Sequence, residues 1–446
     1  MFSIFINDLL EKLHSSKLGA NIEAIYISAL GFADDIALFA GSREKLQSLI
    51  DICTQWSSNN GMAFNTSKCK IMILNTVYDE SEAWNLLDNS LGIVDIYKYL
   101  GVIYSNSRLT SLYTCHMKKI LEKAEERANC VRSLGFVKDG LRPIMCIEMY
   151  KVLIRPILEY AAQIISFRHY YFTSDKDSGE DVFISMLEKF QNRVLKRIIP
   201  CPRSTPPALI RLFTGVEPMI TRIYTLKLRY FWKLSHAQSG DSLAQQIYQY
   251  KRASFKEDDV GFVREIYSIC KKQGNFDVWE GLCSRKENPF KKIRRIVERH
   301  HFDLDLKKAY STPTLYTNIF LLQKRNMIQK YKFESFFMKM GLFKDSDCRR
   351  CFLYELFDHR PYIRQCPWCK ERSWDLLQHK LSQCLALKIQ RQRMQLKFIL
   401  YNADKDFDFG NKDKLFRLAL SRKIFLQVLS KFLLETSNIK GMHSIQ

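Results

Sequence analysis

Two adjacent aspartates, Asp34 and Asp35, stand between two β-prone apolar runs in the stretch from Ile22 to Ser42. This pattern predicts a β-hairpin with the carboxylates at its tip. Neighbouring carboxylates repel each other, and burial adds a desolvation cost, unless a cation lies between them. Two-metal phosphoryl transfer uses carboxylates in this way, with two Mg²⁺ ions ~3.5–4 Å apart. The pair therefore indicates a divalent-metal site, and an Asp-Asp turn facing water is the plain alternative.

A second group of candidate ligands lies near the C-terminus, where five of the 13 cysteines fall between Cys348 and Cys384. Four residues of this region spell the pattern C-x2-C-x9-H-x4-C: Cys366, Cys369, His379 and Cys384. A short C-x2-C loop lets two thiolates meet one Zn²⁺ ion, and H-x4-C places the other two ligands about a helical turn apart. The spacing predicts a zinc site.

Two alternatives to this zinc assignment remain. Cys348 and Cys351 form a competing C-x2-C pair with His359 nearby. We favour the downstream set because all four of its ligands fit one motif. A run of reduced cysteines without metal is the other alternative.

The predicted hairpin is followed by a segment with helical spacing of its apolar residues, namely Leu46, Leu49, Ile50, Cys53 and Trp56. Ser42 is a suitable N-cap, and Asn60-Gly61 is a suitable stop. The order strand, turn, strand, helix is therefore expected around Asp34 and Asp35.

The middle and the end of the chain read as helical. Apolar periodicity predicts a long amphipathic helix from Arg108 to Leu134 and another from Lys414 to Leu434. Pro143 suits the first turn of a helix, and Pro156 within a helical pattern predicts a kink. The polar segment from Tyr171 to Asp181 reads as a loop, with a helix resuming at Val182.

The composition is that of a folded, strongly basic protein. Hydrophobic residues make up 46% of the 446 residues, and 69 Lys and Arg against 47 Asp and Glu give a formal charge of +22. Such an excess attracts polyanions, so nucleic acid is the expected partner, while solvated basic faces and a membrane surface are the alternatives. Candidate phosphate contacts gather at Lys291, Lys292, Arg294, Arg295 and Arg299, and again at Lys324, Arg325, Lys330 and Lys332.

No segment reaches the ~20 uncharged apolar residues of a membrane span, and Met1 to Leu10 lacks the basic start and cleavage site of a signal peptide. We therefore expect an intracellular protein without membrane contact. Its cysteines should stay reduced there, which favours metal ligation over disulfides.

Several motifs, in order along the chain, resemble those of reverse transcriptases. Phe32-Ala33-Asp34-Asp35 resembles the [FY]-A-D-D box, and Tyr97-Lys98-Tyr99-Leu100-Gly101-Val102 resembles the K-Y-L-G-V primer grip. The segments 2–9 and 62–68 resemble the neighbouring elements of the same domain. The stretch 150–161, the connector motifs between 191 and 218, and the cysteine cluster resemble the thumb, connector and zinc knuckle of non-LTR (LINE-type) retrotransposon polymerases. The chain is thus similar to the C-terminal portion of such an enzyme.

This resemblance implies an RNA-directed DNA polymerase. Asp34 and Asp35 would be catalytic ligands of Mg²⁺, and an RNA template, a DNA primer or target and dNTPs would be the partners, with the protein in the nucleus. The nucleotide- and primer-binding residues would be Phe32, Ala33, Lys68, Tyr99, Leu100 and Gly101. For Lys68 a solvent-facing lysine at a strand end, and for Gly101 a plain strand glycine, are the alternatives.

The family carries a third metal-binding aspartate on an earlier strand, upstream of the motifs found here. We therefore expect an N-terminally truncated chain with an incomplete two-metal site that is inactive on its own. The alternative function is a non-catalytic nucleic-acid-binding remnant that uses the thumb, the basic connector and the zinc knuckle.

The expected fold class is α+β, with an incomplete palm of antiparallel sheet and helices, a mostly helical middle and a small zinc-binding module. The expected domains are part of the palm at 1–105, a helical thumb at 106–200, a basic helical connector at 201–345, the zinc knuckle at 346–390 and a helical tail at 391–446.

Overall fold

A computed structural model describes residues 2–436 apart from 23–24, 75–82, 88, 107–111, 132–140, 142, 166–181, 200, 237–241, 258, 260, 275, 281–288, 313, 315–355, 357–363, 367, 374, 402, 404–406 and 422. The chain forms two compact units, each with its own core. The first comprises 1–119, 164–179 and 230–268, and the second comprises 120–163, 180–229 and 269–446.

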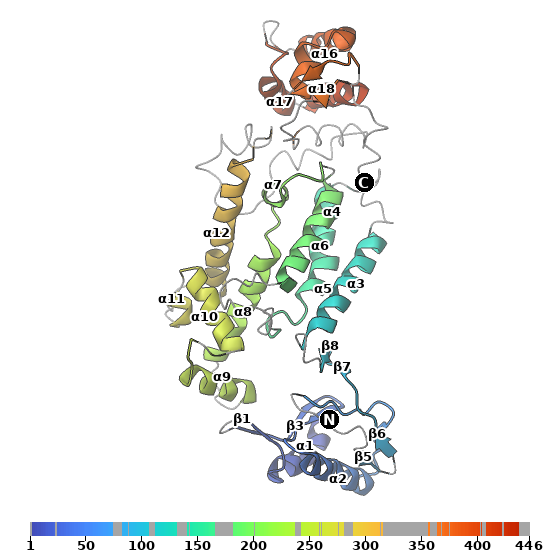
Figure 1. Ribbon diagram of the computed structural model, residues 1–446, viewed down its shortest axis with the longest axis vertical. Coiled ribbons are helices and arrows are strands. Elements are labelled where there is room, and N and C mark those ends of the chain that lie inside the picture. The colour runs from blue at the N-terminus through green and yellow to red at the C-terminus, as the bar shows by residue number, and fades with distance from the viewer. Residues whose placement is uncertain are drawn as a thin grey trace. The chain divides into compact units, whose positions relative to one another are not determined.

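The N-terminal region packs two helices against short antiparallel hairpins (Figure 1). Its elements are α1 (Phe2–Ser15), β1 (Ala20–Ile22), β2 (Ile25–Ile27), β3 (Ala29–Phe32), β4 (Asp35–Leu38) and α2 (Arg43–Asn59). β1 pairs with β2, and β3 pairs with β4. One core joins α1, β3 and α2 through Ile6, Leu9, Leu13, Ala29, Leu49, Cys53 and Trp56. The hairpin predicted around Asp34 and Asp35 is present, with its base in this core.

The helix predicted after the hairpin is confirmed at both ends. The Ser42 side chain accepts a hydrogen bond from the backbone amide of Lys45, so it caps the first turn of α2. Asn60 is the C-cap, and Gly61 follows in the left-handed region at φ 61°, where glycine carries no Cβ penalty. This capped helix supports β3 from the core side.

Two further hairpins complete this region, formed by β5 (Trp84–Leu86), β6 (Asn89–Leu91), β7 (Ile96–Tyr99) and β8 (Val102–Ser105). Leu100 and Gly101, at φ 45° and 81°, form the two-residue turn between β7 and β8. The alternative of a plain strand glycine at Gly101 was therefore wrong. Two-residue hairpin loops with positive φ at both turn residues match the strand twist, which explains the glycine.

The middle of the chain is helical, as predicted. It holds α3 (Thr114–Val131), α4 (Pro143–Met149), η2 (Tyr150–Ile154), α5 (Arg155–Glu159), α6 (Val182–Ile198), α7 (Pro207–Thr214), α8 (Met219–Ser235), α9 (Leu243–Ala253), α10 (Phe262–Lys272), α11 (Phe276–Trp279) and α12 (Pro289–Tyr310). The amphipathic helix expected from Arg108 to Leu134 is present as α3, which buries Met117, Ile120 and Ala124; residues 107–111 and 132–140 lie outside the described residues.

The predicted disturbance at Pro156 takes the form of a π-helical turn. η2 covers Tyr150–Ile154, and the backbone amide of Arg155 donates to the carbonyl of Tyr150. Pro156 then stands in the first turn of α5, where its missing amide hydrogen costs little. The helix starts expected at Pro143 and Val182 are also found. The loop predicted from Tyr171 to Asp181 lies outside the described residues.

Within the second unit, a buried ion pair joins two helices that are distant in sequence. Arg211 of α7 donates from Nε to Asp305 Oδ2 of α12 at 2.8 Å, and both side chains are nearly inaccessible. Asn192 of α6 accepts a further hydrogen bond from the same guanidinium at 3.2 Å. This ion pair ties the basic helix α12 to α7.

The C-terminal part consists of β9 (Arg364–Gln365), β10 (Arg372–Ser373), α15 (Leu376–Ser382), η5 (Leu385–Leu387), α16 (Lys388–Leu400), α17 (Lys412–Ser421) and α18 (Lys423–Glu435). The prediction of one helix from Lys414 to Leu434 was wrong, since two helices occupy this stretch and pack against each other. Each helix buries apolar residues, among them Phe416 of α17 and Leu429 of α18. Two short helices that pack against each other can cover these apolar side chains. No described helix has the length and apolar content that a membrane crossing requires.

Candidate active-site hairpin and metal centre

The two aspartates lie at the tip of the β3–β4 hairpin. The last paired residues are Phe32 and Asp35, so Ala33 and Asp34 form the turn. Ala33 has a φ of 53°, the left-handed conformation that short hairpin turns demand and that is uncommon for residues other than glycine. Both aspartates are exposed. Their carboxylates are therefore presented to solvent at the end of a tight turn.

The base of this hairpin is fixed by close packing. Ala29 is 1% exposed and contacts the core of α1 and α2. A Cβ atom at Gly31 would lie 3.1 Å from Leu10 Cδ1 of α1, which is a tighter approach than most side chains allow. The hairpin thus begins in the core at Ala29 and reaches solvent at Phe32, whose side chain is 62% exposed.

Asp35 shares its surroundings with the β7–β8 hairpin and with the turn that holds Lys68. Burial raises the pKa of Tyr99, and the negative charge of Asp35 raises this pKa further. The pKa of Tyr97 is raised by burial, then by Cys69 and Asp35. The hydroxyl of Tyr97 also donates to the backbone carbonyl of Lys68 at 3.3 Å. Three segments that are distant in sequence therefore converge near Asp35.

The remaining predicted residues of this region lie on exposed turns. Lys68 follows Asn65 in a turn, with its backbone amide donating to the Asn65 carbonyl at 3.0 Å, and its side chain is exposed. It is therefore not at a strand end. Leu100 is 40% exposed at the tip of the β7–β8 hairpin.

The hairpin offers two carboxylates for a metal ion. Among the described residues, the one group of three or more His, Cys, Asp or Glu side chains close enough to share an ion is the cysteine–histidine set near the C-terminus. Mg²⁺ keeps several waters and is commonly held by one or two carboxylates together with substrate phosphates. Asp34 and Asp35 therefore fit one hydrated ion, whereas a two-ion clamp needs further oxygen donors.

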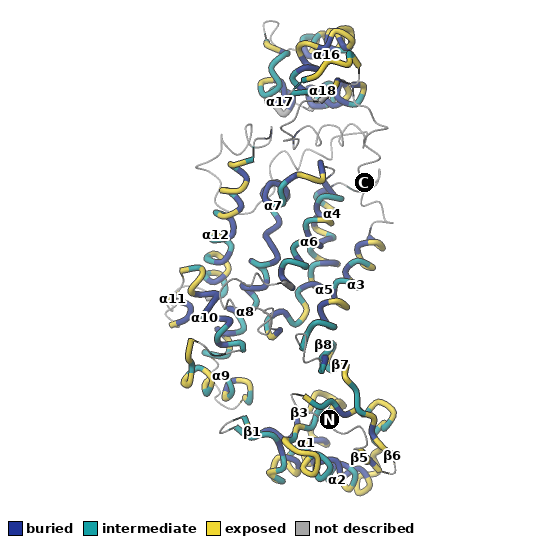
Figure 2. Tube along the Cα trace, in the orientation of Figure 1, coloured by how far each residue is buried: buried dark blue, intermediate teal, exposed yellow. Residues whose placement is uncertain are grey.

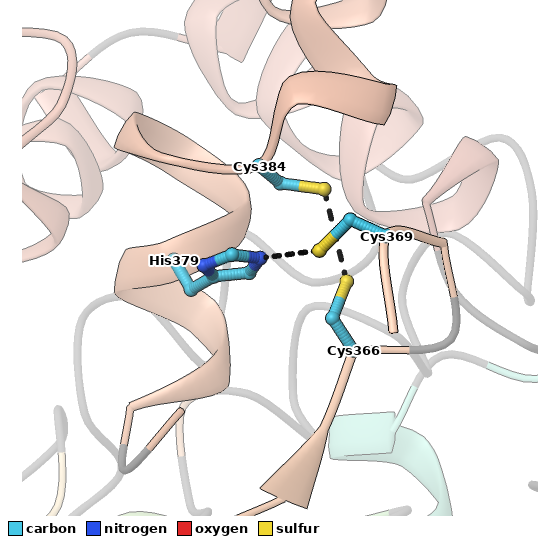
Figure 3. Close-up of side chains that lie close together, drawn as sticks. All are labelled: Cys366, Cys369, His379 and Cys384. Carbon is cyan, nitrogen blue, oxygen red and sulfur yellow. Dashed lines mark hydrogen bonds between the residues drawn. The ribbon is translucent and has the colours of Figure 1, made fainter. Parts of the chain in front are cut away.

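The cysteine–histidine set is compact, and three of its four residues are buried. The ligand atoms of Cys366, Cys369, His379 and Cys384 all lie within 4.8 Å of one another (Figure 3). The sulfurs of Cys366 and Cys384 are 3.7 Å apart, and Cys369 Sγ lies 3.1 Å from His379 Nε2. In a tetrahedral site with Zn–S distances of ~2.3 Å, two sulfurs are about 3.8 Å apart. The donor set and its spacing fit a structural Zn²⁺ site.

Local structure explains how Cys366 and Cys369 meet. The loop between β9 and β10 is closed by the bond from the Lys370 amide to the Cys366 carbonyl at 2.9 Å, with Lys370 at φ 63°. Burial disfavours the Cys366 thiolate, but the backbone amides of Cys369 and Trp368 donate to its sulfur and lower its pKa overall. Amides that point at a sulfur stabilise thiolate ligation.

His379 lies in α15, and Cys384 is the second residue after the end of this helix. Asp375 caps α15 by accepting from the Gln378 amide at 2.9 Å, and the Cys384 amide donates to the His379 carbonyl at 2.8 Å. His379 is 3% exposed, and Glu371 Oε2 lies 3.9 Å from its Nδ1. At this distance the Glu371 carboxylate makes no hydrogen bond to the ring, so it acts on His379 as a nearby negative charge.

Three supporting residues were not predicted. Glu371 lies behind His379, Arg391 of α16 donates to the carbonyls of Lys380 and Cys384, and Trp368 Nε1 donates to the Thr436 carbonyl at 3.0 Å. Glu371 could have been found as the acidic residue inside the motif. Arg391 and Trp368 act through contacts that no spacing rule indicates. The competing set of Cys348, Cys351 and His359 lies outside the described residues.

The β3–β4 hairpin lies in a part of the chain that matches a known protein family. Residues 1–104 match the family model described as reverse transcriptase (RNA-dependent DNA polymerase). This region is similar to a reverse transcriptase domain. No curated protein and no solved structure matches the chain. The reverse transcriptase match includes the β3–β4 hairpin, the Lys68 turn and almost all of the β7–β8 hairpin, and the cysteine–histidine centre lies beyond it.

Proposed function

We propose that residues 1–104 are the carboxylate- and primer-binding part of an RNA-directed DNA polymerase from a LINE-type retrotransposon. The observation that carries this proposal is the position of Asp34 and Asp35, exposed at a hairpin tip inside the region that matches reverse transcriptases. Nucleotidyl transfer needs carboxylates in such a position, on a rigid element and open to substrate.

The residues around the hairpin tip would have different roles, which follow from the chemistry of their side chains. Asp34 and Asp35 would hold Mg²⁺, which when bound stabilises negative charge on the reacting phosphate. Tyr99 and Leu100, on the neighbouring hairpin, would contact the primer end. Lys68, exposed on a turn next to Tyr97, would offer its ammonium group to the triphosphate of the incoming dNTP.

The LINE assignment is supported by the order of motifs along the chain. A reverse transcriptase match at 1–104 is followed by the helical segments α3 to α12 and then by a Cys-Cys-His-Cys set. We assign Zn²⁺ to Cys366, Cys369, His379 and Cys384 as a structural ion. The formal charge of +22 supports nucleic acid as the partner of the whole chain.

The small number of carboxylates at the hairpin tip favours a second candidate function, which is nucleic-acid binding without sustained synthesis. Within the described residues, no third Asp, Glu, His or Cys joins Asp34 and Asp35 in a metal-binding group. Two carboxylates do not make a two-ion clamp, so the isolated chain would bind primer and template without sustained synthesis. In that case it acts as a nucleic-acid-binding protein.

The test combines a crosslink with a synthesis assay. A DNA primer that ends in photoreactive 4-thiothymidine is annealed to an RNA template and irradiated with the full chain. We expect crosslinked peptides from 97–101 and from the β3–β4 hairpin. Crosslinks confined to segments outside 1–104, at any salt concentration, would contradict the polymerase proposal.

The synthesis assay separates the two candidate functions. The same primer–template is supplied with dNTPs and Mg²⁺, and Asp34→Asn/Asp35→Asn is the control. Extension equal to that of the control supports a chain that only binds nucleic acid. Extension well above the control shows instead that the site is complete in this chain.

A further inference from the structure

Helix α16 carries buried and exposed apolar side chains on opposite faces. Its inner face is formed by Arg391, Met394 and Phe398, all of them buried. The ring of Phe398 lies 5.0 Å from that of Phe425 in α18 and 5.7 Å from that of Phe409. Arg391, Met394 and Phe398 thus pack into the core of the C-terminal part. The packing of this core does not use the opposite face of α16.

The outer face presents a line of large aliphatic side chains to solvent. Ile389 is 62% exposed, Leu396 58% and Leu400 69%. Leu385, in the short turn before α16, is 77% exposed. We call these four residues the α16 seam. A spacing of seven and four residues places Ile389, Leu396 and Leu400 on one side of α16, with Leu385 in the turn before it, and Figure 2 shows exposed positions recurring along α16.

An aliphatic line of this kind is unusual on a free surface. Single exposed apolar residues are ordinary, whereas several large aliphatic side chains that recur on one face of a helix, with polar residues beside them, are typical of a helix–helix interface. The line is narrow, because the polar residues Gln392 and Arg393 lie close beside it, one on each side, between Ile389 and Leu396. A strip one residue wide is the form of helix–helix seams.

The charges beside the seam all have one sign. Lys388 lies on one flank, and Arg393 and Lys397 lie on the other, each of them exposed. No Asp or Glu occurs from Leu385 to Tyr401. A second copy of the same face would bring these cations together, whereas an acidic surface would complement them.

We propose that the α16 seam binds an amphipathic helix of a partner protein, whose aliphatic residues at matching spacing are flanked by Asp and Glu. Nucleic acid suits this face less well, because aliphatic side chains offer no ring on which bases stack. A membrane surface also suits it less well, since interfacial helices insert a broad apolar face.

The test uses a defined peptide and the full chain loaded with zinc. The probe is a fluorescent four-heptad peptide with Leu at positions a and d and Glu at e and g. A matched peptide carries Lys in place of Glu, and vesicles of phosphatidylserine and phosphatidylcholine serve as the membrane probe. We expect the acidic peptide to bind with a Kd on the order of 10 µM or tighter and the basic peptide to bind at least ~10-fold more weakly.

Variants of the seam decide whether the peptide binds there. Leu396→Glu and, separately, Ile389→Glu should weaken binding of the acidic peptide at least ~10-fold. Lys431→Gln is the control: it changes the charge by the same amount as each of them, at a residue of α18 whose side chain is 62% exposed. Zinc content and circular dichroism report the fold of each variant. Absent binding of the acidic peptide, equal binding of both peptides, equal binding to the seam variants, or seam-dependent binding to vesicles alone would overturn the proposal.

Discussion

The two candidate metal sites differ in how many ligands the described fold brings together. The cysteine–histidine centre collects four ligands from the short segment 366–384 and buries three of them. The β3–β4 hairpin presents two exposed carboxylates and, among the described residues, no third metal-binding partner. A closed structural site is complete within one small module, whereas an open catalytic site must leave positions for substrate and draw ligands from distant segments.

The difference extends to what each site does for the fold. A structural zinc ion contributes its binding energy to folding, because the site does not exist in the unfolded chain. The hairpin instead depends on the hydrophobic core beneath it, where Leu9 and Ala29 are buried. We therefore expect the two regions to respond to different perturbations.

The largest effect is expected from removing one zinc ligand. Cys366→Ser replaces a buried thiolate by a hydroxyl, and structural Zn²⁺ sites contribute roughly 10–16 kcal/mol of apparent binding energy in small peptides. We expect loss of one zinc per chain in metal analysis and loss of protection from hydrogen exchange in 364–400. Cys130→Ser, at an exposed cysteine of α3, should retain the zinc. Equal zinc content in both variants would contradict the assignment.

A cavity in the N-terminal core should affect the N-terminal region, including the β3–β4 hairpin, and leave the cysteine–histidine centre intact. Leu9 is fully buried in α1, and Leu→Ala in a core costs about 2–5 kcal/mol. Leu9→Ala should therefore speed hydrogen exchange of peptides from β3 and β4 and leave the zinc content unchanged. Ile4→Ala, at a residue of the same helix that is 80% exposed, should change neither. Simultaneous loss of zinc would show that the two regions are coupled.

A smaller effect is expected where the zinc loop meets the end of α18. Trp368→Phe removes the bond from Nε1 to the Thr436 carbonyl, and a single hydrogen bond contributes about 0.5–1.5 kcal/mol. The melting temperature of the C-terminal part should fall while the zinc stays bound. Loss of zinc in this variant would mean that the α18 contact belongs to the metal site itself.

The smallest effect concerns the charge of Asp35. Its carboxylate disfavours the ionised form of Tyr99, which burial already disfavours more strongly. Asp35→Asn should therefore lower the Tyr99 pKa, which stays above its ordinary value because burial remains. Tyrosine labelled with ¹³C reports this pKa in a pH titration by NMR. Asp34→Asn should leave it where it is, and an equal fall in both variants would contradict the placement of Asp35.

Local patterns predicted the parts of the molecule that depend on neighbours in sequence. Ser42 as a cap, the turn at Asp34 and the grouping of Cys366 with His379 all follow from short spacings. The helical period likewise predicted α3. In each case the physical cause lies within a few residues of the feature.

Features that depend on distant contacts were not predicted. The resemblance placed Gly101 in a primer-grip strand, whereas the residue belongs to the turn between β7 and β8. The periodicity from Lys414 to Leu434 runs through the break between α17 and α18, since both helices bury apolar faces against each other. The approach of Asp35 to Tyr99 joins segments more than sixty residues apart; residue spacing gives no signal for it, and only the resemblance to reverse transcriptases assigned both residues to one site.

We propose that the β3–β4 hairpin holds one weakly bound ion, because among the described residues it offers two carboxylates and no third ligand, too few for a two-ion clamp. Electron paramagnetic resonance of Mn²⁺, titrated into the zinc-loaded chain, tests this most directly by counting bound ions. We predict one Mn²⁺ that is displaced by Mg²⁺ and is lost in Asp34→Asn/Asp35→Asn. Two tightly bound ions, or Mn²⁺ binding that is unchanged in the double variant, would contradict it.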